Sequence, residues 1–284
     1  MSIAELLTTQ FLTNSNTPRL DLELLLAFIL NQPRSFLYAH SEYELTPEQE
    51  KTFDALLNRR ANGEPIAYIL GKKEFWSLEL AVNKNVLIPR PETELLVEIA
   101  LSKLNQESAM IADLGTGSGA IALALADARP KWSIVATDLS ADALNLACYN
   151  AKQLQLSNIE FYCGDWCEAL PNKEFDLIIS NPPYIAQNDP HLQQGDVRFE
   201  PKIALESGNG LVALQKIIIR AKSHLKIGGL LMLEHGYDQS EQVQNLLHQN
   251  KYQAITPYQD LAGIYRVVVA EKTRVENENN HSKR

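Results

Sequence analysis

Asp113-Leu-Gly-Thr-Gly-Ser-Gly119 joins a short apolar run, Ile111–Leu114, to an alanine-rich run, Ala120–Ala128. Its three glycines permit a tight turn and let backbone N–H groups approach a ligand closely. The GxGxG spacing differs from the GxGxxG of dinucleotide-binding enzymes, and the sequence has no P-loop motif for a triphosphate. A strand, a glycine-rich turn and a helix in this order predict the nucleoside-binding end of an α/β sheet, although such turns also serve helix–strand packing.

The alternation of apolar and helical runs continues through the rest of the chain. Further strands are expected at Ser133–Thr137, Ile159–Tyr162, Phe175–Ser180, Gly229–Leu233 and Tyr265–Ala270, and helices at Glu92–Leu104, Ala141–Leu154 and Leu211–Leu225. Repeated βα units predict a parallel, doubly wound sheet.

The sequence before this region has a different pattern. Apolar residues at helical spacing, among them Leu6, Phe11 and Leu22, and an N-cap at Thr46 predict an all-helical domain over residues 1–73. Residues 74–90 are expected to form a β-hairpin linker, with strands at 75–82 and 86–88 around a turn at 83–85. The main domain would span 91–271, followed by a polar, disordered tail over 272–284.

Composition restricts the classes of function. The 284 residues are 45% hydrophobic, as expected for a globular protein, and a net charge of −9 weighs against direct binding of nucleic acid. Cys148, Cys163 and Cys167 form no CxxC pair, so neither a metal site nor a disulfide framework is expected. With neither a signal peptide nor an apolar run of about 18 residues, the chain is expected to be cytoplasmic, away from membranes.

Acidic residues follow the second and third predicted strands. Asp138 comes 19 residues after Gly119, where a carboxylate can accept both hydroxyls of a ribose, or else cap the next helix. Asp165 could accept the exocyclic amine of adenine, and Trp166 could cover the ring or fill the core. Together with the glycine turn, Asp138 indicates a nucleoside site.

Asn181-Pro-Pro-Tyr184 directly follows the fourth predicted strand, at the sheet edge where ligands bind in open α/β folds. The two prolines remove two N–H donors and fix the backbone, so that carbonyl groups can point into a cavity. Asn181 adds a side-chain acceptor and Tyr184 an aromatic wall. Such a site suits a planar NH₂ group, although the same tetrapeptide can also form a plain rigid turn.

These motifs carry a resemblance. The glycine turn, Asp138, Gly-Asp-Trp and Asn-Pro-Pro-Tyr, in this order, resemble class I S-adenosylmethionine-dependent methyltransferases that act on planar amino groups. Four further stretches narrow the resemblance to one family: PIAYILG at 65–71, FW at 75–76, LIPRPETEL at 87–95 and HLQQGDVRFEP at 191–201. They resemble the bacterial protein-(glutamine-N5) methyltransferases of peptide chain release factors, the HemK/PrmC family, over residues 5–270.

The resemblance implies a Rossmann-like, mostly parallel seven-stranded sheet with a small N-terminal helical domain that helps to dock the partner. It also implies methylation of the glutamine N5 in the Gly-Gly-Gln motif of release factors, with S-adenosylmethionine as donor and S-adenosylhomocysteine as product. The implied cofactor residues are Gly115, Thr116, Gly117, Ser118, Gly119, Asp138, Asp165, Trp166 and Asn181. The implied substrate residues are Asn181, Pro182, Pro183 and Tyr184, of which Asn181, Pro182 and Tyr184 would be catalytic.

Several alternatives remain open at this point. An adenine-N6 methyltransferase of nucleic acid uses a similar tetrapeptide, and a ribosomal-protein glutamine methyltransferase is a nearer relative. A non-catalytic nucleoside-binding partner of the translation machinery is a third possibility. Arg90 and Glu92 could line the substrate entrance or form a salt bridge at a hinge.

Overall fold

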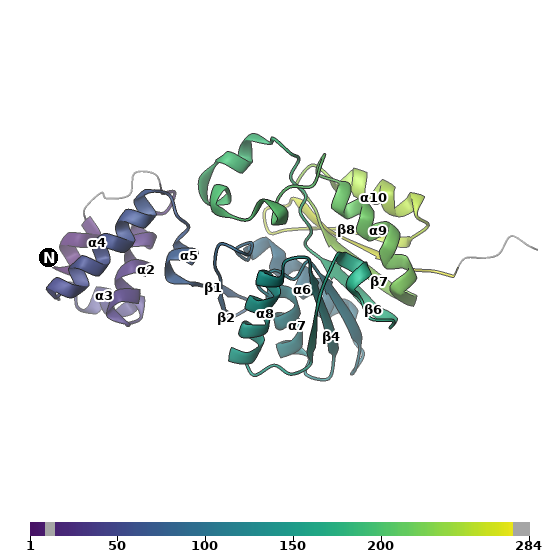
Figure 1. The fold of residues 1–284 in the computed structure, drawn as a ribbon, viewed down its shortest axis with the longest axis horizontal. Coiled ribbons are helices and arrows are strands. Elements are labelled where there is room, and N and C mark those ends of the chain that lie inside the picture. The colour runs from purple at the N-terminus through teal and green to yellow at the C-terminus, as the bar shows by residue number, and fades with distance from the viewer. Residues whose placement is uncertain (9–14, 275–284) are drawn as a thin grey trace, which may run out of the picture.

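The computed structural model describes residues 1–8 and 15–274 and shows a helical region beside a larger α/β region (Figure 1). Phe11, for which a helical position was predicted, lies outside the described residues. Residues 275–284, most of the predicted tail, also lie outside them. Residues 272–274 have no regular secondary structure. In the described part of the chain, every helix is too short or too polar to cross a membrane.

A seven-stranded sheet forms the centre of the α/β region. In spatial order its strands are β5 (Ile159–Cys163), β4 (Ser133–Asp138), β3 (Met110–Leu114), β6 (Phe175–Ser180), β7 (Leu225–Glu234), β9 (Tyr265–Glu271) and β8 (Gln253–Gln259). The pairs from β5 to β7 are parallel, and β9 is antiparallel to both β7 and β8. The predicted mostly parallel, doubly wound sheet is confirmed.

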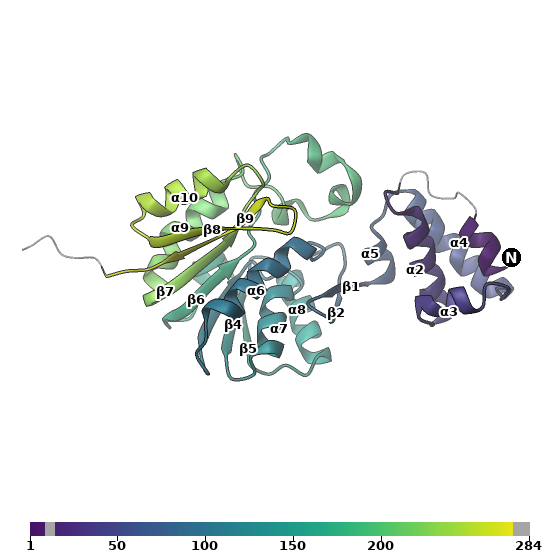
Figure 2. The same ribbon diagram turned by 180° about the vertical axis from the view of Figure 1, so that it is seen from behind.

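Helices cover both faces of this sheet (Figures 1 and 2). One face carries α6 (Glu94–Lys103), α7 (Ala120–Ala128) and α8 (Ala141–Gln153); the other carries α9 (Val212–His224) and α10 (Ser240–Gln249). Because successive strand residues point to opposite faces, Ile111 packs into one core and Ala112 into the other. This double coverage explains why the inner strands read as continuous apolar runs.

The N-terminal region is all-helical, as predicted. Its helices are α1 (Ile3–Thr8), α2 (Pro18–Leu30), α3 (Arg34–Ala39), α4 (Pro47–Ala61) and α5 (Ile66–Leu70). They enclose an apolar core of their own, which includes Leu25 and Phe53. The predicted N-cap is confirmed, because Thr46 and Gln49 form a reciprocal capping box at the start of α4.

The β-hairpin forms from other residues than those predicted. The prediction of strands at 75–82 and 86–88 was wrong: β1 (Lys72–Phe75) pairs with β2 (Leu78–Ala81). Trp76 and Ser77, with φ of 51° and 62°, form the two-residue turn that folds the apolar run back on itself. Residues 86–88 form no strand, although Val86 and Ile88 are buried.

Candidate active site

The site lies at the carboxyl edge of the sheet, where the strand order reverses between β3 and β6. The chain runs outward from β3 to β5 on one side, returns to β6, and then continues to β7 on the other side. The glycine turn therefore leaves β3 beside the point at which Asn181 leaves β6. A reversal of this kind opens a crevice between neighbouring loops, which is where open α/β sheets bind ligands.

The glycine turn is held by backbone hydrogen bonds. The N–H groups of Gly115 and Thr116 donate to the Thr137 carbonyl at 2.8 and 2.9 Å. Gly115, Gly117 and Gly119 have φ of 72°, 58° and 89°, the left-handed region in which glycine carries no steric penalty. The sequence needs glycine here because the turn must pass from β3 to α7 within a few residues.

Asp138 closes the turn from the neighbouring strand. Its Oδ2 accepts the Gly117 N–H at 2.8 Å, and its Oδ1 accepts the Ser140 N–H at 2.9 Å. Burial raises the pKa of this carboxyl. The cap of α8 is Ser140, whose hydroxyl accepts the Ala143 N–H, so Asp138 is not the helix cap. Asp138 also lines the pocket described next.

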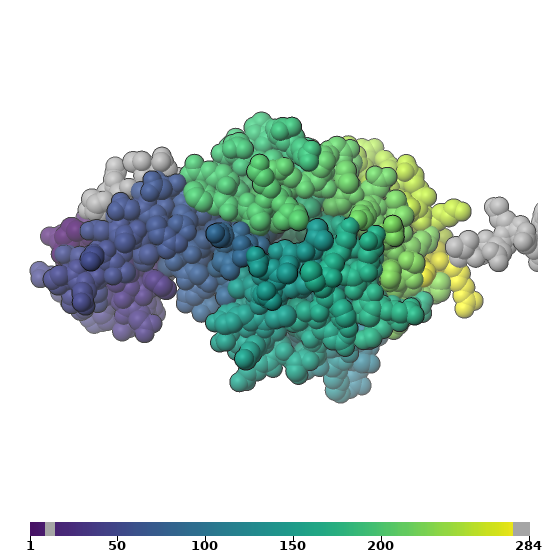
Figure 3. Space-filling model, viewed as in Figure 1, coloured from purple at the N-terminus to yellow at the C-terminus, as the bar shows by residue number. Residues whose placement is uncertain are grey.

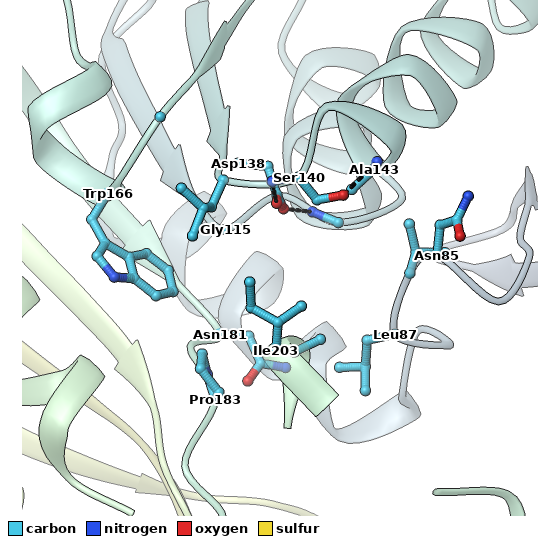
Figure 4. Close-up of a pocket in the computed structure, with 15 residues that line it drawn as sticks. Asn85, Leu87, Gly115, Asp138, Ser140, Ala143, Trp166, Asn181, Pro183 and Ile203 are labelled. Atoms are coloured by element: carbon cyan, nitrogen blue, oxygen red, sulfur yellow. Dashed lines mark hydrogen bonds between the residues drawn. The ribbon is translucent and has the colours of Figure 1, made fainter. Parts of the chain in front are cut away.

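A first pocket opens over this turn, with about 690 Å³ of empty space including its mouth. Of the predicted cofactor residues it brings together Gly115, Gly117, Asp138, Trp166 and Asn181. Asn181 and Pro183 lie across the pocket from Asp138 (Figure 4). Its walls include residues that motif reading missed, namely Asn85, Val86, Leu87, Leu139, Ser140, Ile203 and Ala204. Most of these side chains are apolar and none belongs to a known binding motif, so the sequence alone does not mark them as site residues.

The remaining predicted cofactor residues lie behind the pocket surface. Thr116 is buried and donates to Asp113 Oδ2 at 2.6 Å, while Asp113 Oδ1 accepts no hydrogen bond of ordinary geometry from residues 1–8 or 15–274. Burial raises the pKa of Asp113 to about 7. Ser118 is also buried, and its carbonyl accepts from Asn150. Thr116 and Ser118 therefore pack beneath the glycine turn, and Gly119 is the N-cap residue of α7.

Trp166 and Asp165 follow β5. The Trp166 ring packs over the turn so closely that a Cβ added to Gly115 would lie 2.7 Å from it. Trp166 itself has φ of 48°, a conformation that turns the indole into the pocket. Asp165 forms an ion pair with Lys216 of α9 and does not line the first pocket.

A second pocket of about 470 Å³ adjoins the first. It is lined by all four residues of Asn-Pro-Pro-Tyr, and it shares Leu87, Asn181, Pro183 and Ala204 with the first pocket. Asn181 Nδ2 donates to Thr93 Oγ1 at 3.0 Å, and the Tyr184 hydroxyl donates to Glu234 Oε1 at 3.3 Å. Burial raises the pKa of Tyr184, so this hydroxyl keeps its proton. The first and second pockets therefore meet at Asn181.

Arg90 lines a pocket and also forms an ion pair. It lines the second pocket, and its guanidinium donates to Glu200 Oε2 at 2.6 Å. Glu200 also accepts the Ile88 N–H, and burial raises its pKa to about 7. Glu92 is exposed and lines neither pocket. The Arg90–Glu200 pair ties the segment after Tyr184 to the segment before α6.

Solved structures share this architecture. A methyltransferase from Pyrococcus furiosus, 17% identical, covers 69% of this chain and 90% of its own with a TM-score of 0.54. A 16S rRNA methyltransferase from T. thermophilus, solved with AdoMet and guanosine, is 21% identical over 71% of this chain and 49% of its own, with a TM-score of 0.52. These likenesses show the fold. The class follows from the family model that residues 91–250 match, the methyltransferase small domain, so the chain is a methyltransferase.

Sequence comparison gives the particular family. Residues 7–71 match the PrmC N-terminal domain, and residues 91–250 match the methyltransferase small domain. Release factor glutamine methyltransferases of Coxiella burnetii and Escherichia coli are 53% and 47% identical, covering 94% and 90% of this chain and 96% and 92% of their own. The chain belongs to the release factor glutamine methyltransferase family.

Proposed function

We propose that this protein methylates the side-chain amide nitrogen, N5, of the glutamine in the Gly-Gly-Gln motif of peptide chain release factors. S-adenosylmethionine is the donor, and S-adenosylhomocysteine is the product. The observation that carries the proposal is the meeting of two pockets at Asn181 in a chain whose relatives are named for this reaction.

The first pocket suits the cofactor. Its volume falls within the usual range of small-molecule sites, and a Cβ at Gly117 would meet nothing within 4 Å, so the backbone there is open to a ligand. In the proposal the turn from Gly115 to Gly119 holds the methionine part and Asp138 the ribose. Trp166 meets the adenine, whereas Asp165, which pairs with Lys216 and does not line this pocket, is left out of the cofactor site. When bound, S-adenosylmethionine supplies a methyl group on a positively charged sulfur.

The second pocket receives the glutamine side chain. The Asn181 Oδ1 and the Pro182 carbonyl accept the two amide hydrogens, while Pro183 and Tyr184 pack against the carboxamide. A carboxamide nitrogen is a poor nucleophile because its lone pair is delocalised, so orientation toward the methyl group supplies much of the rate. The acceptors also stabilise the positive charge that develops on nitrogen. As nitrogen gains the methyl group, it loses one proton to water, since the tetrapeptide offers no strong base.

The partner and the domain roles belong to the same proposal. The helical region, which ends with α5, helps to dock the release factor. The hairpin of β1 and β2 and the segment up to residue 90 link this region to the catalytic domain over 91–271, and the protein acts in the cytoplasm. A release factor is a protein substrate, and the charge of −9 agrees with the absence of direct nucleic-acid binding. No metal ion takes part.

Mass spectrometry of unmethylated release factor, incubated with this protein and S-adenosylmethionine, tests the proposal. The Gly-Gly-Gln peptide should gain one methyl group. Asn181→Ala should abolish the gain while cofactor affinity stays within about threefold. Asn105→Ala, at an exposed asparagine that lines neither pocket, is the matched control and should change neither turnover nor cofactor affinity. Methyl groups found in ribosomal protein or nucleic acid instead would mean that the substrate is one of those molecules. Equal losses of turnover and cofactor affinity in Asn181→Ala would contradict the role of Asn181.

A further inference from the structure

A buried carboxyl lies behind the second pocket. Glu234 is the last residue of β7, and its exposed fraction is 2%. The parallel register pairs Ser180 with Leu233, which puts Asn181 and Glu234 at the same level at the ends of adjacent strands. The proposed reaction assigns no role to this acid, although a buried carboxyl requires partners to offset its desolvation.

Two hydrogen bonds connect the Asn-Pro-Pro-Tyr motif to buried side chains of neighbouring elements. The Tyr184 hydroxyl donates to Glu234 Oε1 at 3.3 Å, and Glu234 Oε2 accepts no hydrogen bond from the described residues. Thr93, which is buried at the start of α6, accepts from Asn181 Nδ2 at 3.0 Å.

The contact with Thr93 sets the direction of the Asn181 amide. The two ends of an asparagine amide are similar in shape, so the hydrogen-bonding partner decides which end faces the pocket. Thr93 Oγ1 accepts from the NH₂ end of Asn181. Because Asn181 lines both pockets, its other end, Oδ1, is the one available to the substrate.

We infer that Thr93 is a positioning residue that holds Asn181 with its amide oxygen toward the glutamine of the substrate. The inference rests on the proposed function and adds to it a residue outside the Asn-Pro-Pro-Tyr motif. Glu234 holds the other polar side chain of that motif, through the Tyr184 hydroxyl.

A matched pair of variants at position 93 tests the inference. Thr93→Val keeps the shape and removes the hydroxyl, whereas Thr93→Ser keeps the hydroxyl. Thr93→Val should lower kcat for release factor methylation by about tenfold or more, with KM for S-adenosylmethionine within about twofold. Thr93→Ser should stay within about threefold of the parent. An equal loss in both variants, or a parallel loss of cofactor affinity in Thr93→Val, would overturn the inference.

A second readout does not depend on the substrate. The side-chain amide signals of Asn181, assigned by their loss in Asn181→Ala, should shift in the NMR spectrum of Thr93→Val and stay in place in Thr93→Ser. Unchanged signals in Thr93→Val would overturn the inference. Should the parent protein leave release factor unmethylated, the proposed function would fail, and the amide signals would still decide whether Thr93 orients Asn181.

Discussion

Arg60 Nη1 donates to Asp196 Oδ1 at 3.1 Å, joining the last turn of α4 to a 3₁₀ turn, η4 (Gly195–Phe199), that follows the Asn-Pro-Pro-Tyr motif. Figure 3 shows the surface of this later segment meeting that of the helical region. Arg198 adds a hydrogen bond to the Asn62 carbonyl. Since Val197 lines the second pocket, the helical region braces one wall of the proposed substrate site.

Arg60→Ala should destabilise the protein strongly. The Arg60 side chain is 9% exposed and also pairs with Asp21, which is 2% exposed, so its loss leaves a buried carboxylate without its cation. We expect a loss of about 3 kcal/mol in the free energy of unfolding, measured by urea denaturation. Arg59→Ala, which breaks an exposed pair with Glu64, is the control and should cost less than about 1 kcal/mol. Similar losses in both variants would show that the buried Arg60–Asp21 pair contributes no more to stability than an exposed ion pair.

Alanine at two glycines separates backbone strain from steric clash. Gly115 and Gly117 both have positive φ, so either substitution should cost about 1–2 kcal/mol. Only at Gly115 would the new Cβ meet the Trp166 ring. Gly115→Ala should therefore also shift the Trp166 fluorescence. Equal fluorescence spectra for the two variants would show that the indole does not pack on the turn.

Asp138→Ala should weaken S-adenosylmethionine binding. The variant loses the proposed ribose acceptor and the bond that holds the Gly117 N–H. Hydrogen bonds to a charged group contribute about 1.5–3 kcal/mol, so Kd measured by calorimetry should rise about tenfold or more. Asp142→Ala, an exposed site in the first turn of α8, is the control. Unchanged affinity in Asp138→Ala would remove Asp138 from the cofactor site.

Glu234→Gln should change the pH dependence of stability. Burial raises the pKa of Glu234 to about 7 from its usual 4.5, with Arg266 and Glu92 as the charged groups facing it. The folded state therefore prefers the protonated acid, and this stabilisation is lost as pH rises from about 4.5 through 7. Urea denaturation should show the parent losing up to about 3 kcal/mol more than Glu234→Gln between pH 5 and 8. Parallel pH profiles would place the pKa of Glu234 at its ordinary value.

Local patterns made much of this fold predictable. The capping box at Thr46 and the apolar runs of β3, β4 and β6 are short-range signals, and each element formed near its predicted range. The hairpin was misplaced because its turn uses Trp76 and Ser77, residues that rarely adopt positive φ. The edge strand β8 gave no signal, since its residues are largely exposed and include a proline.

The candidate site was only partly predictable for a different reason. Asn181 and Asp138 stand in recognisable motifs at strand ends. The contacts of Asn181 with Thr93 and of Tyr184 with Glu234 join residues 88 and 50 positions apart. Such pairs depend on how the strands and helices pack, which the spacing of residues along one segment does not reveal.

The place of β9 has a consequence for synthesis on the ribosome. β9 follows every other strand in the chain, yet it lies between β7 and β8, and its Val267 pairs with Glu234 (Figure 2). A chain emerges at about 5–20 residues per second, with N-terminal parts folding first. The helical region, with its own core, can thus form early, whereas β8 waits for β9, the one strand that pairs with it in the described part of the chain. A nascent chain therefore has an unfinished wall behind Glu234 until residues 265–271 have left the exit tunnel.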